Sequence, residues 1–125
     1  MTQFTNKKVY DLEERTAKFG EDVISLCKKI RRSHINDPII NQLIRSGTSV
    51  GANYMEANGA SSKRDFTNKI FICKKEAQET KHWLRMLASC QTDSDTAVIR
   101  DLWKEGQELT LIFQKIASSA RIRSA

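Results

Sequence analysis

Apolar residues recur along four segments of the chain in alternating steps of three and four positions. This spacing places them on one face of an α-helix. The clearest track runs through the first segment, where only Thr16 is polar: Val9, Leu12, Thr16, Phe19, Val23, Leu26 and Ile30. Together the tracks predict four helices and a frayed C-terminal tail, with helices at about 8–33, 38–58, 62–90 and 95–118.

Few residues interrupt these segments. The 125 residues include five glycines and one proline, Pro38. A β-sandwich or β-barrel needs turn residues every ~8–12 positions, and six glycines and prolines are too few for that. The composition therefore excludes both β-folds. Pro38 suits the first turn of the second helix, with Asn36 or Asp37 as its cap. Four helices with short connections predict a single all-α domain over 1–125, an antiparallel up-down-up-down four-helix bundle.

Two glycines lie inside the second predicted helix. Gly47 and Gly51 each cost about 1 kcal/mol relative to alanine there. Their spacing of four puts both on one side of the helix, where they allow a neighbouring backbone to approach closely. The alternative is that they are simply tolerated weak positions.

A second apolar track lies beside the first on the fourth helix, comprising Ile99, Trp103, Gly106, Thr110, Phe113 and Ala117. On the third helix, Trp83 also falls away from the core stripe. Two interpretations remain open. Either the core face of the fourth helix is wide, or copies of the chain associate through it with Trp103 as an aromatic anchor.

No catalytic or metal-binding motif is present. A di-metal bundle needs two Glu-x-x-His motifs. The chain has one, Glu79 to His82, and its histidine points roughly 160° away from the core stripe. Phosphate-loop, dinucleotide-binding and nucleophile-elbow motifs are absent. The three cysteines form no CxxC and are expected to be reduced thiols. We therefore predict no enzyme activity, no cofactor, no metal and no small-molecule substrate.

Positive charge is the stronger functional signal, since 21 Lys and Arg against 15 Asp and Glu give a net charge of +6. Four cations of the third helix fall within about 40° of each other in projection: Lys63, Lys74, Lys81 and Arg85. A second cluster closes the first helix: Lys28, Lys29, Arg31 and Arg32. Both predict binding to a polyanion. The alternatives are a solvated surface and cations that stabilise a helix C-terminus.

No base-reading motif is visible, so nucleic-acid binding would be directed at the backbone and sensitive to salt. No run approaches the ~18 apolar residues of a membrane span. The N-terminus lacks the pattern of a secretory signal, so we expect a cytoplasmic protein without membrane contact.

Two pieces of sequence carry a family resemblance. They are Arg45–Ala57 and a set on the third helix: Asp65, Phe66, Lys75–Thr80, Trp83, Leu84 and Leu87. Over roughly 8–118 the chain resembles the bacterial four-helix-bundle proteins known as 23S ribosomal RNA intervening-sequence proteins. A relative of that family is the accessory variability protein of diversity-generating retroelements.

The resemblance implies a cytosolic bacterial bundle that assembles as a ring-shaped homopentamer. Some members are encoded within insertions of large-subunit ribosomal RNA genes. The accessory variability protein is a basic pentamer that binds nucleic acid and a reverse transcriptase.

The first of these pieces contains a polar strip along the edge of the core track, comprising Ser46, Ser49, Asn53 and Glu56. Asn53 and Glu56 are predicted to bond to a neighbouring helix, with a solvated face as the alternative. We predict a non-enzymatic homo-oligomer that binds RNA or a nucleoprotein partner through basic surfaces. The alternative is a protein-interaction scaffold that binds no nucleic acid.

Overall fold

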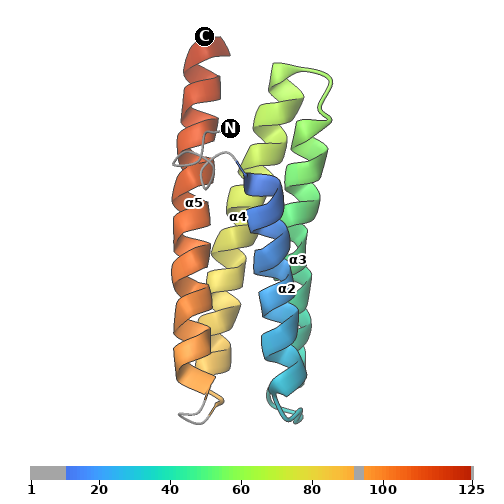
Figure 1. The fold of residues 1–125 in the computed structure, drawn as a ribbon, viewed down its shortest axis with the longest axis vertical. Helices are drawn as coiled ribbons and strands as arrows, with labels where there is room; N and C mark the ends of the chain where they lie inside the picture. Colours follow the sequence, from blue (N-terminus) through green and yellow to red (C-terminus); the bar gives the residue numbers. More distant parts are fainter. Residues whose placement is uncertain (1–10, 92–94, 125) are drawn as a thin grey trace.

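The computed structural model describes residues 11–91 and 95–124, with side chains up to Ala120. This part of the chain contains four helices and no β-strand: α2 (Leu12–Lys29), α3 (Asp37–Asn58), α4 (Lys63–Ala88) and α5 (Thr96–Ser124). Successive helices run in alternating directions (Figure 1). The predicted all-α four-helix bundle is confirmed.

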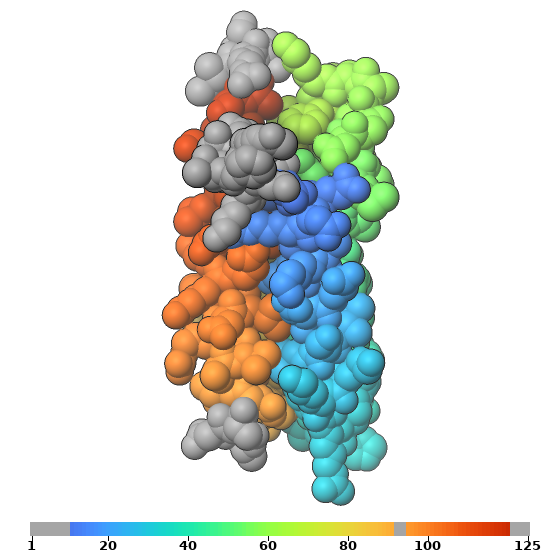
Figure 2. Space-filling view, viewed as in Figure 1, coloured from blue at the N-terminus to red at the C-terminus, as the bar shows by residue number. Residues whose placement is uncertain are grey.

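The four helices do not pack equally. The α3–α4 and α4–α5 interfaces are the most extensive, whereas α2 and α5 make few contacts. A groove of about 530 Å³ consequently separates α2 from α5, with Arg15 and Phe19 on one wall and Leu102 and Glu105 on the other. It lies on the face shown in Figure 2, where residues of α2 and α5 are side by side.

The core consists of the apolar tracks, with Phe19 and Phe113 as the largest fully buried side chains. On α5 the second track faces inward: all its members except Trp103 are buried. Trp103 is 39% exposed, and Val98, which lies outside the second track, is 37% exposed. The core face of α5 is therefore wide, and only Trp103 of the second track lies at the surface.

Glycines mark the contact between α2 and α3. A Cβ at Gly47 would lie 2.9 Å from Val23 Cγ2, and one at Gly51 would lie 3.3 Å from Thr16 Oγ1. Gly20 on α2 faces the Gly47 carbonyl in the same way, at 3.3 Å. The two backbones thus approach closely, and this approach occurs inside one subunit.

The first helix ends earlier than predicted. Helix α2 stops at Lys29 instead of near 33, and Ile30 is extended with φ −86° and ψ 131°. Asn36 explains the break, because its buried side chain accepts a hydrogen bond from Ser33 N and donates one to the Arg31 carbonyl. These bonds stabilise a turn that competes with the helix. The predicted start near 8 lies outside the described residues.

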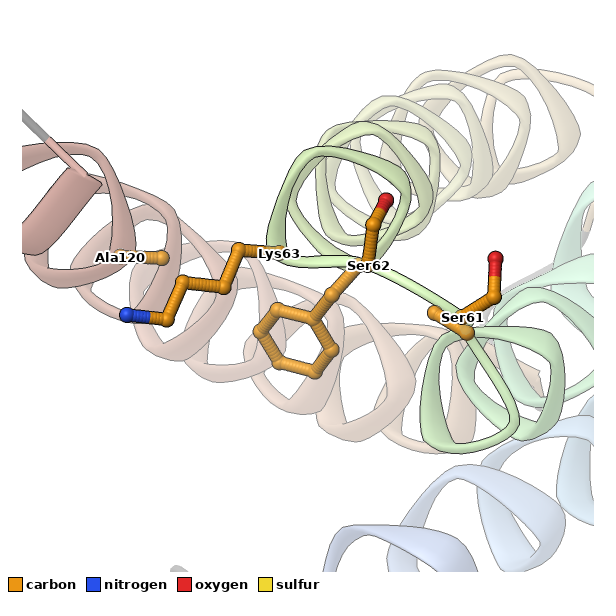
Figure 3. Close-up of a pocket in the computed structure, with 6 residues that line it drawn as sticks. Ser61, Ser62, Lys63 and Ala120 are labelled. Carbon is orange, nitrogen blue, oxygen red and sulfur yellow. The ribbon is translucent and has the colours of Figure 1, made fainter.

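The fourth helix is longer than the predicted 95–118, because α5 continues to Ser124. Residues 118–124 contain no glycine or proline to end the helix. Ala120 also packs near the start of α4, where it lines a pocket of about 360 Å³ with Lys63 and Phe66 (Figure 3). Ser62 caps α4 by accepting a hydrogen bond of 3.0 Å from Asp65 N.

Candidate nucleic-acid interface

Two lysines of α4 lie along its contact with α5. The Lys74 ammonium donates a hydrogen bond to Gln114 Oε1, and the Lys81 ammonium donates one to Gln107 Oε1. Lys81 Nζ also lies 5.0 Å from the centroid of the Trp103 ring. The glutamine acceptors are neutral, so the interactions hold both lysines in place without cancelling their charge.

Two carboxylates on each of α4 and α5 form ion pairs with arginines of the other two helices. Glu76 and Glu79 of α4 bind Arg45 of α3, with N–O distances of 3.2 and 2.5 Å. Glu105 and Glu108 of α5 bind Arg15 of α2, both at 2.7 Å. These four carboxylates therefore lie toward α3 and α2, away from the contact between α4 and α5 where Lys74 and Lys81 lie.

The Arg15 interaction is strong enough to alter titration. The hydrogen bond to Glu105 raises the pKa of Arg15 well above its ordinary value, against the opposing effect of burial. A side chain that binds two carboxylates while partly buried also anchors α2 to α5 beside the groove between them. This pair was missed in the sequence, because nothing in the spacing of 90 residues links Arg15 to Glu105.

At the end of α4, a pocket of about 390 Å³ opens between this helix and the start of α5. Arg85, Arg100 and Lys104 line it together with Ile99 and Trp103. Arg100 and Lys104 were not predicted, although their spacing of four around Trp103 was a visible signal. We use the name basic face for the cations along α4 and α5: Lys63, Lys74, Lys81, Arg85, Arg100 and Lys104.

The basic face extends along most of the length of α4. Lys63 is exposed at the first turn of α4 and Arg85 in its last turn. A rise of 1.5 Å per residue separates them by about 33 Å along the helix. Such a length can span several phosphates of a nucleic-acid backbone.

The second predicted cluster is divided between a helix end and a loop. Lys28 and Lys29 lie in the last turn of α2, and Arg31 is exposed just beyond it. Arg32 binds Asp37 and Asn41, so its charge is locally neutralised. Asn36 Nδ2 donates a hydrogen bond of 3.4 Å to Gln91 Oε1, which places this cluster at the same end of the bundle as Arg85.

The two residues of the polar strip on α3 that were predicted to bond to a neighbouring helix behave differently from each other. Glu56 reaches α4 through an ion pair of 2.7 Å with Lys69. The Asn53 amide donates a hydrogen bond of 2.9 Å to the Ser49 carbonyl of its own helix, and it forms none to another helix among the described residues. Trp83 is half-buried, and its ring meets the His82 ring edge-on, with 4.9 Å between the ring centroids.

The described residues contain no cluster of three or more His, Cys, Asp or Glu side chains suited to a metal ion. Burial raises the pKa of Cys27 to about 11 and that of Cys73 to about 12. Both thiols are therefore protonated near neutral pH and are poor nucleophiles. None of the described helices combines the length and apolar character needed to cross a bilayer.

Comparisons with known proteins agree with this architecture. No curated protein matches the chain. A protein of unknown function from the S23 ribosomal protein family of Bacteroides thetaiotaomicron has a similar crystal structure, with a TM-score of 0.73 and 28% sequence identity. The match covers 89% of this chain and 98% of that one. The family model of the 23S rRNA-intervening sequence protein matches residues 7–117, and the chain therefore belongs to that family.

Proposed function

We propose that the chain is a non-enzymatic, cytoplasmic homo-oligomer that binds structured RNA through the basic face. The observation that carries this proposal is the difference between the partners of the lysines and those of the glutamates on α4 and α5. Lys74 and Lys81 bind neutral glutamines, whereas Glu76 and Glu105 bind arginines on other helices. The result is a surface of retained positive charge.

The physical basis is the release of counterions from RNA. Each phosphate that a lysine or arginine neutralises releases condensed cations, so affinity falls steeply as salt rises. Contacts of this kind position a protein on the backbone without reading the sequence. We therefore expect recognition of RNA shape and charge, with weak preference among sequences.

Self-association multiplies these contacts. The groove between α2 and α3 has a volume of about 390 Å³ and is lined by the exposed side chains of Ile24 and Met55. Three glutamates also line it, so a second copy meets it with cationic side chains at the rim, which a chain of net charge +6 can supply. Because α2 and α3 form the side of the bundle away from α4 and α5, this contact leaves much of the basic face free. The pentamer implied by the resemblance is the assembly we propose.

The RNA-binding proposal is tested by fluorescence anisotropy with a labelled stem-loop RNA at 50 and 200 mM salt. We expect submicromolar affinity at 50 mM, weakened at least tenfold at 200 mM. The triple variant Lys74→Gln, Lys81→Gln and Arg85→Gln should bind at least tenfold more weakly. Binding no tighter than micromolar at 50 mM, or insensitive to salt, contradicts the proposal.

A charge-matched control separates local from overall electrostatics. The triple variant Lys18→Gln, Arg32→Gln and Lys69→Gln also removes three positive charges, but each of these cations is already paired with a carboxylate. We expect less than a threefold loss of affinity. A partner protein that survives nuclease treatment and high salt, without RNA binding, would support the scaffold instead.

The assembly is tested by light scattering coupled to gel filtration. We expect a mass several times the 14.3 kDa of one chain. Met55→Asp should lower that mass, because Met55 is 64% exposed beside the proposed contact. Trp103→Asp, on the other side of the bundle, should leave it unchanged. A monomeric wild-type protein contradicts the proposal, and assembly that depends on Trp103 instead places the contact on α5.

A further inference from the structure

We infer that the pocket between the end of α4 and the start of α5 binds an unpaired nucleotide of RNA. The base would lie against Trp103, and the adjoining phosphates would contact Arg85, Arg100 and Lys104. This inference rests on the proposed function and adds a preference within it, for RNA that offers unstacked bases.

The pocket has the size and the interior that a base requires. Its volume of about 390 Å³ falls in the range of small-ligand sites. The floor is apolar, because Ala88 and Ile99 line it and Ile99 is 4% exposed. Trp103, also in the lining, is partly exposed and therefore offers indole surface to an incoming ring.

Trp103 is held in place before any ligand arrives. The Lys81 ammonium lies over its ring, and the same ammonium binds Gln107 one turn further along α5. A base that stacks on Trp103 consequently meets an ordered ring next to a fixed positive charge. Stacking of this kind typically changes affinity by about 5- to 150-fold per base.

The rim supplies the charge complementarity. Arg85, Arg100 and Lys104 all line the pocket, and none forms an ion pair with a described carboxylate. Arginine forks suit phosphate oxygens. An acidic peptide without aromatic residues would also neutralise these cations, but it brings no planar ring for Trp103, whereas every nucleotide satisfies both parts of the site.

The pocket also differs from the rest of the basic face in what it can admit. Bases of a duplex are stacked and paired, and proteins read RNA bases mainly in loops, bulges and ends. Lys63 and Lys74 can follow the backbone of a stem, while the pocket accepts a base only where the strand is open. We therefore expect a stem-loop to bind more tightly than a blunt duplex with the same number of phosphates.

The first test measures this preference by anisotropy on the full chain. For the wild type we expect at least fivefold tighter binding to a stem with an eight-nucleotide loop than to the blunt duplex. Trp103→Leu, which keeps an apolar side chain, should abolish the preference and leave duplex affinity within twofold. Trp83→Phe is the control and should leave both affinities unchanged.

The second test uses the protein's own fluorescence. The chain has two tryptophans, so Trp83→Phe leaves Trp103 as the sole reporter. Titration with hexauridylate should quench its emission, and Arg100→Gln should weaken this binding and lower the salt slope by about one. Hexaglutamate at the same concentration should not quench it.

The outcomes separate the two proposals. Equal binding of loop and duplex, unaffected by Trp103→Leu, overturns the pocket and leaves RNA binding by the basic face intact. Failure to bind either RNA overturns both. Quenching by hexaglutamate as strong as that by hexauridylate overturns the nucleotide in favour of an acidic protein. Because the fluorescence test needs no change at Trp103, it decides the matter even if Trp103→Leu does not fold.

Discussion

Thr80 Oγ1 of α4 donates a hydrogen bond of 3.0 Å to Ser46 Oγ of α3, and both side chains are fully buried. This contact sits in the α3–α4 interface, one of the two most extensive in the bundle. Apolar side chains alone permit several registers between two helices. Each hydroxyl also bonds to a carbonyl of its own helix, Leu43 for Ser46 and Glu76 for Thr80. The hydrogen bond between the two helices forms in only one register, so it favours the observed packing of α3 against α4.

Thr80→Val should therefore destabilise the protein although it keeps the shape of the side chain. The buried Ser46 hydroxyl loses its partner from α4, and we expect the free energy of unfolding to fall by about 1–2 kcal/mol. Adding Ser46→Ala should recover part of the loss, because the Ser46 hydroxyl, which keeps only a long bond of 3.3 Å to the Leu43 carbonyl, is then no longer buried against valine. Urea denaturation measures both changes. Thr48→Val, at an exposed position of α3, is the matched control and should stay within about 0.5 kcal/mol.

Gly47→Ala tests the close approach of α2 and α3. Alanine gains about 1 kcal/mol of helix propensity. Its Cβ would nevertheless lie 2.9 Å from Val23 Cγ2, and overpacking of a core costs about 1–3 kcal/mol. We expect a net loss of stability in thermal and chemical unfolding. At Gly59 a Cβ meets nothing closer than carbonyl oxygens at 3.9 Å, so Gly59→Ala should be tolerated, and equal effects would refute the packing argument.

Arg45→Met should destabilise the α3–α4 interface by leaving a buried carboxylate unpaired. Glu76 has only 12% of its side chain exposed and is bound by Arg45. Burial works against the charge on Arg45, yet Glu76 and Glu79 together raise its pKa. We expect a loss of about 1–2 kcal/mol in urea denaturation. Lys18→Met breaks an exposed pair with Asp22 and should cost at most about 0.5 kcal/mol.

The buried thiols predict a loss of stability in alkali. Burial raises the pKa of Cys27 to about 11 and that of Cys73 to about 12, from an ordinary value of 9.0. Above about pH 9 the unfolded chain loses protons that the folded protein keeps. The free energy of unfolding therefore falls as pH rises, by up to about 1.4 kcal/mol per pH unit for each thiol, until the folded thiols also ionise.

Urea denaturation between pH 9 and 10.5 measures that slope. Cys27→Ala and Cys73→Ala should each make it shallower. Cys90→Ala removes an exposed thiol and should keep the wild-type slope. A slope that none of the three variants changes would show that other groups cause the alkaline loss.

Local patterns in the sequence were sufficient for the architecture. The steps of three and four gave four helices, and the spacing of Gly47 and Gly51 indicated a close helix contact. The helix ends were less accurate, because the Asn36 turn breaks α2 through hydrogen bonds that periodicity does not encode. The end of α5 was placed too early for a related reason, since its continuation needs no apolar repeat.

The candidate site was only half visible in the sequence. The lysine stripe of α4 could be projected from one helix, whereas Arg100 and Lys104 belong to α5 and join it only after the two helices pack. The ion pairs of Arg15 and Arg45 link helices distant in sequence, so their role in segregating charge depends on tertiary structure. Asn53 bonds within its own helix, because its amide lies 2.9 Å from the Ser49 carbonyl one turn earlier.

Those ion pairs have a consequence for how the protein meets a charged partner in solution. Glu76 and Glu79 are neutralised by Arg45, and Glu105 and Glu108 by Arg15, so the cations of the basic face leave an excess of positive charge on the side of α4 and α5. The molecule is then a permanent electric dipole. In the field of a polyanion it experiences a torque that rotates α4 and α5 forward before contact, so a larger share of diffusive collisions begins in the binding orientation.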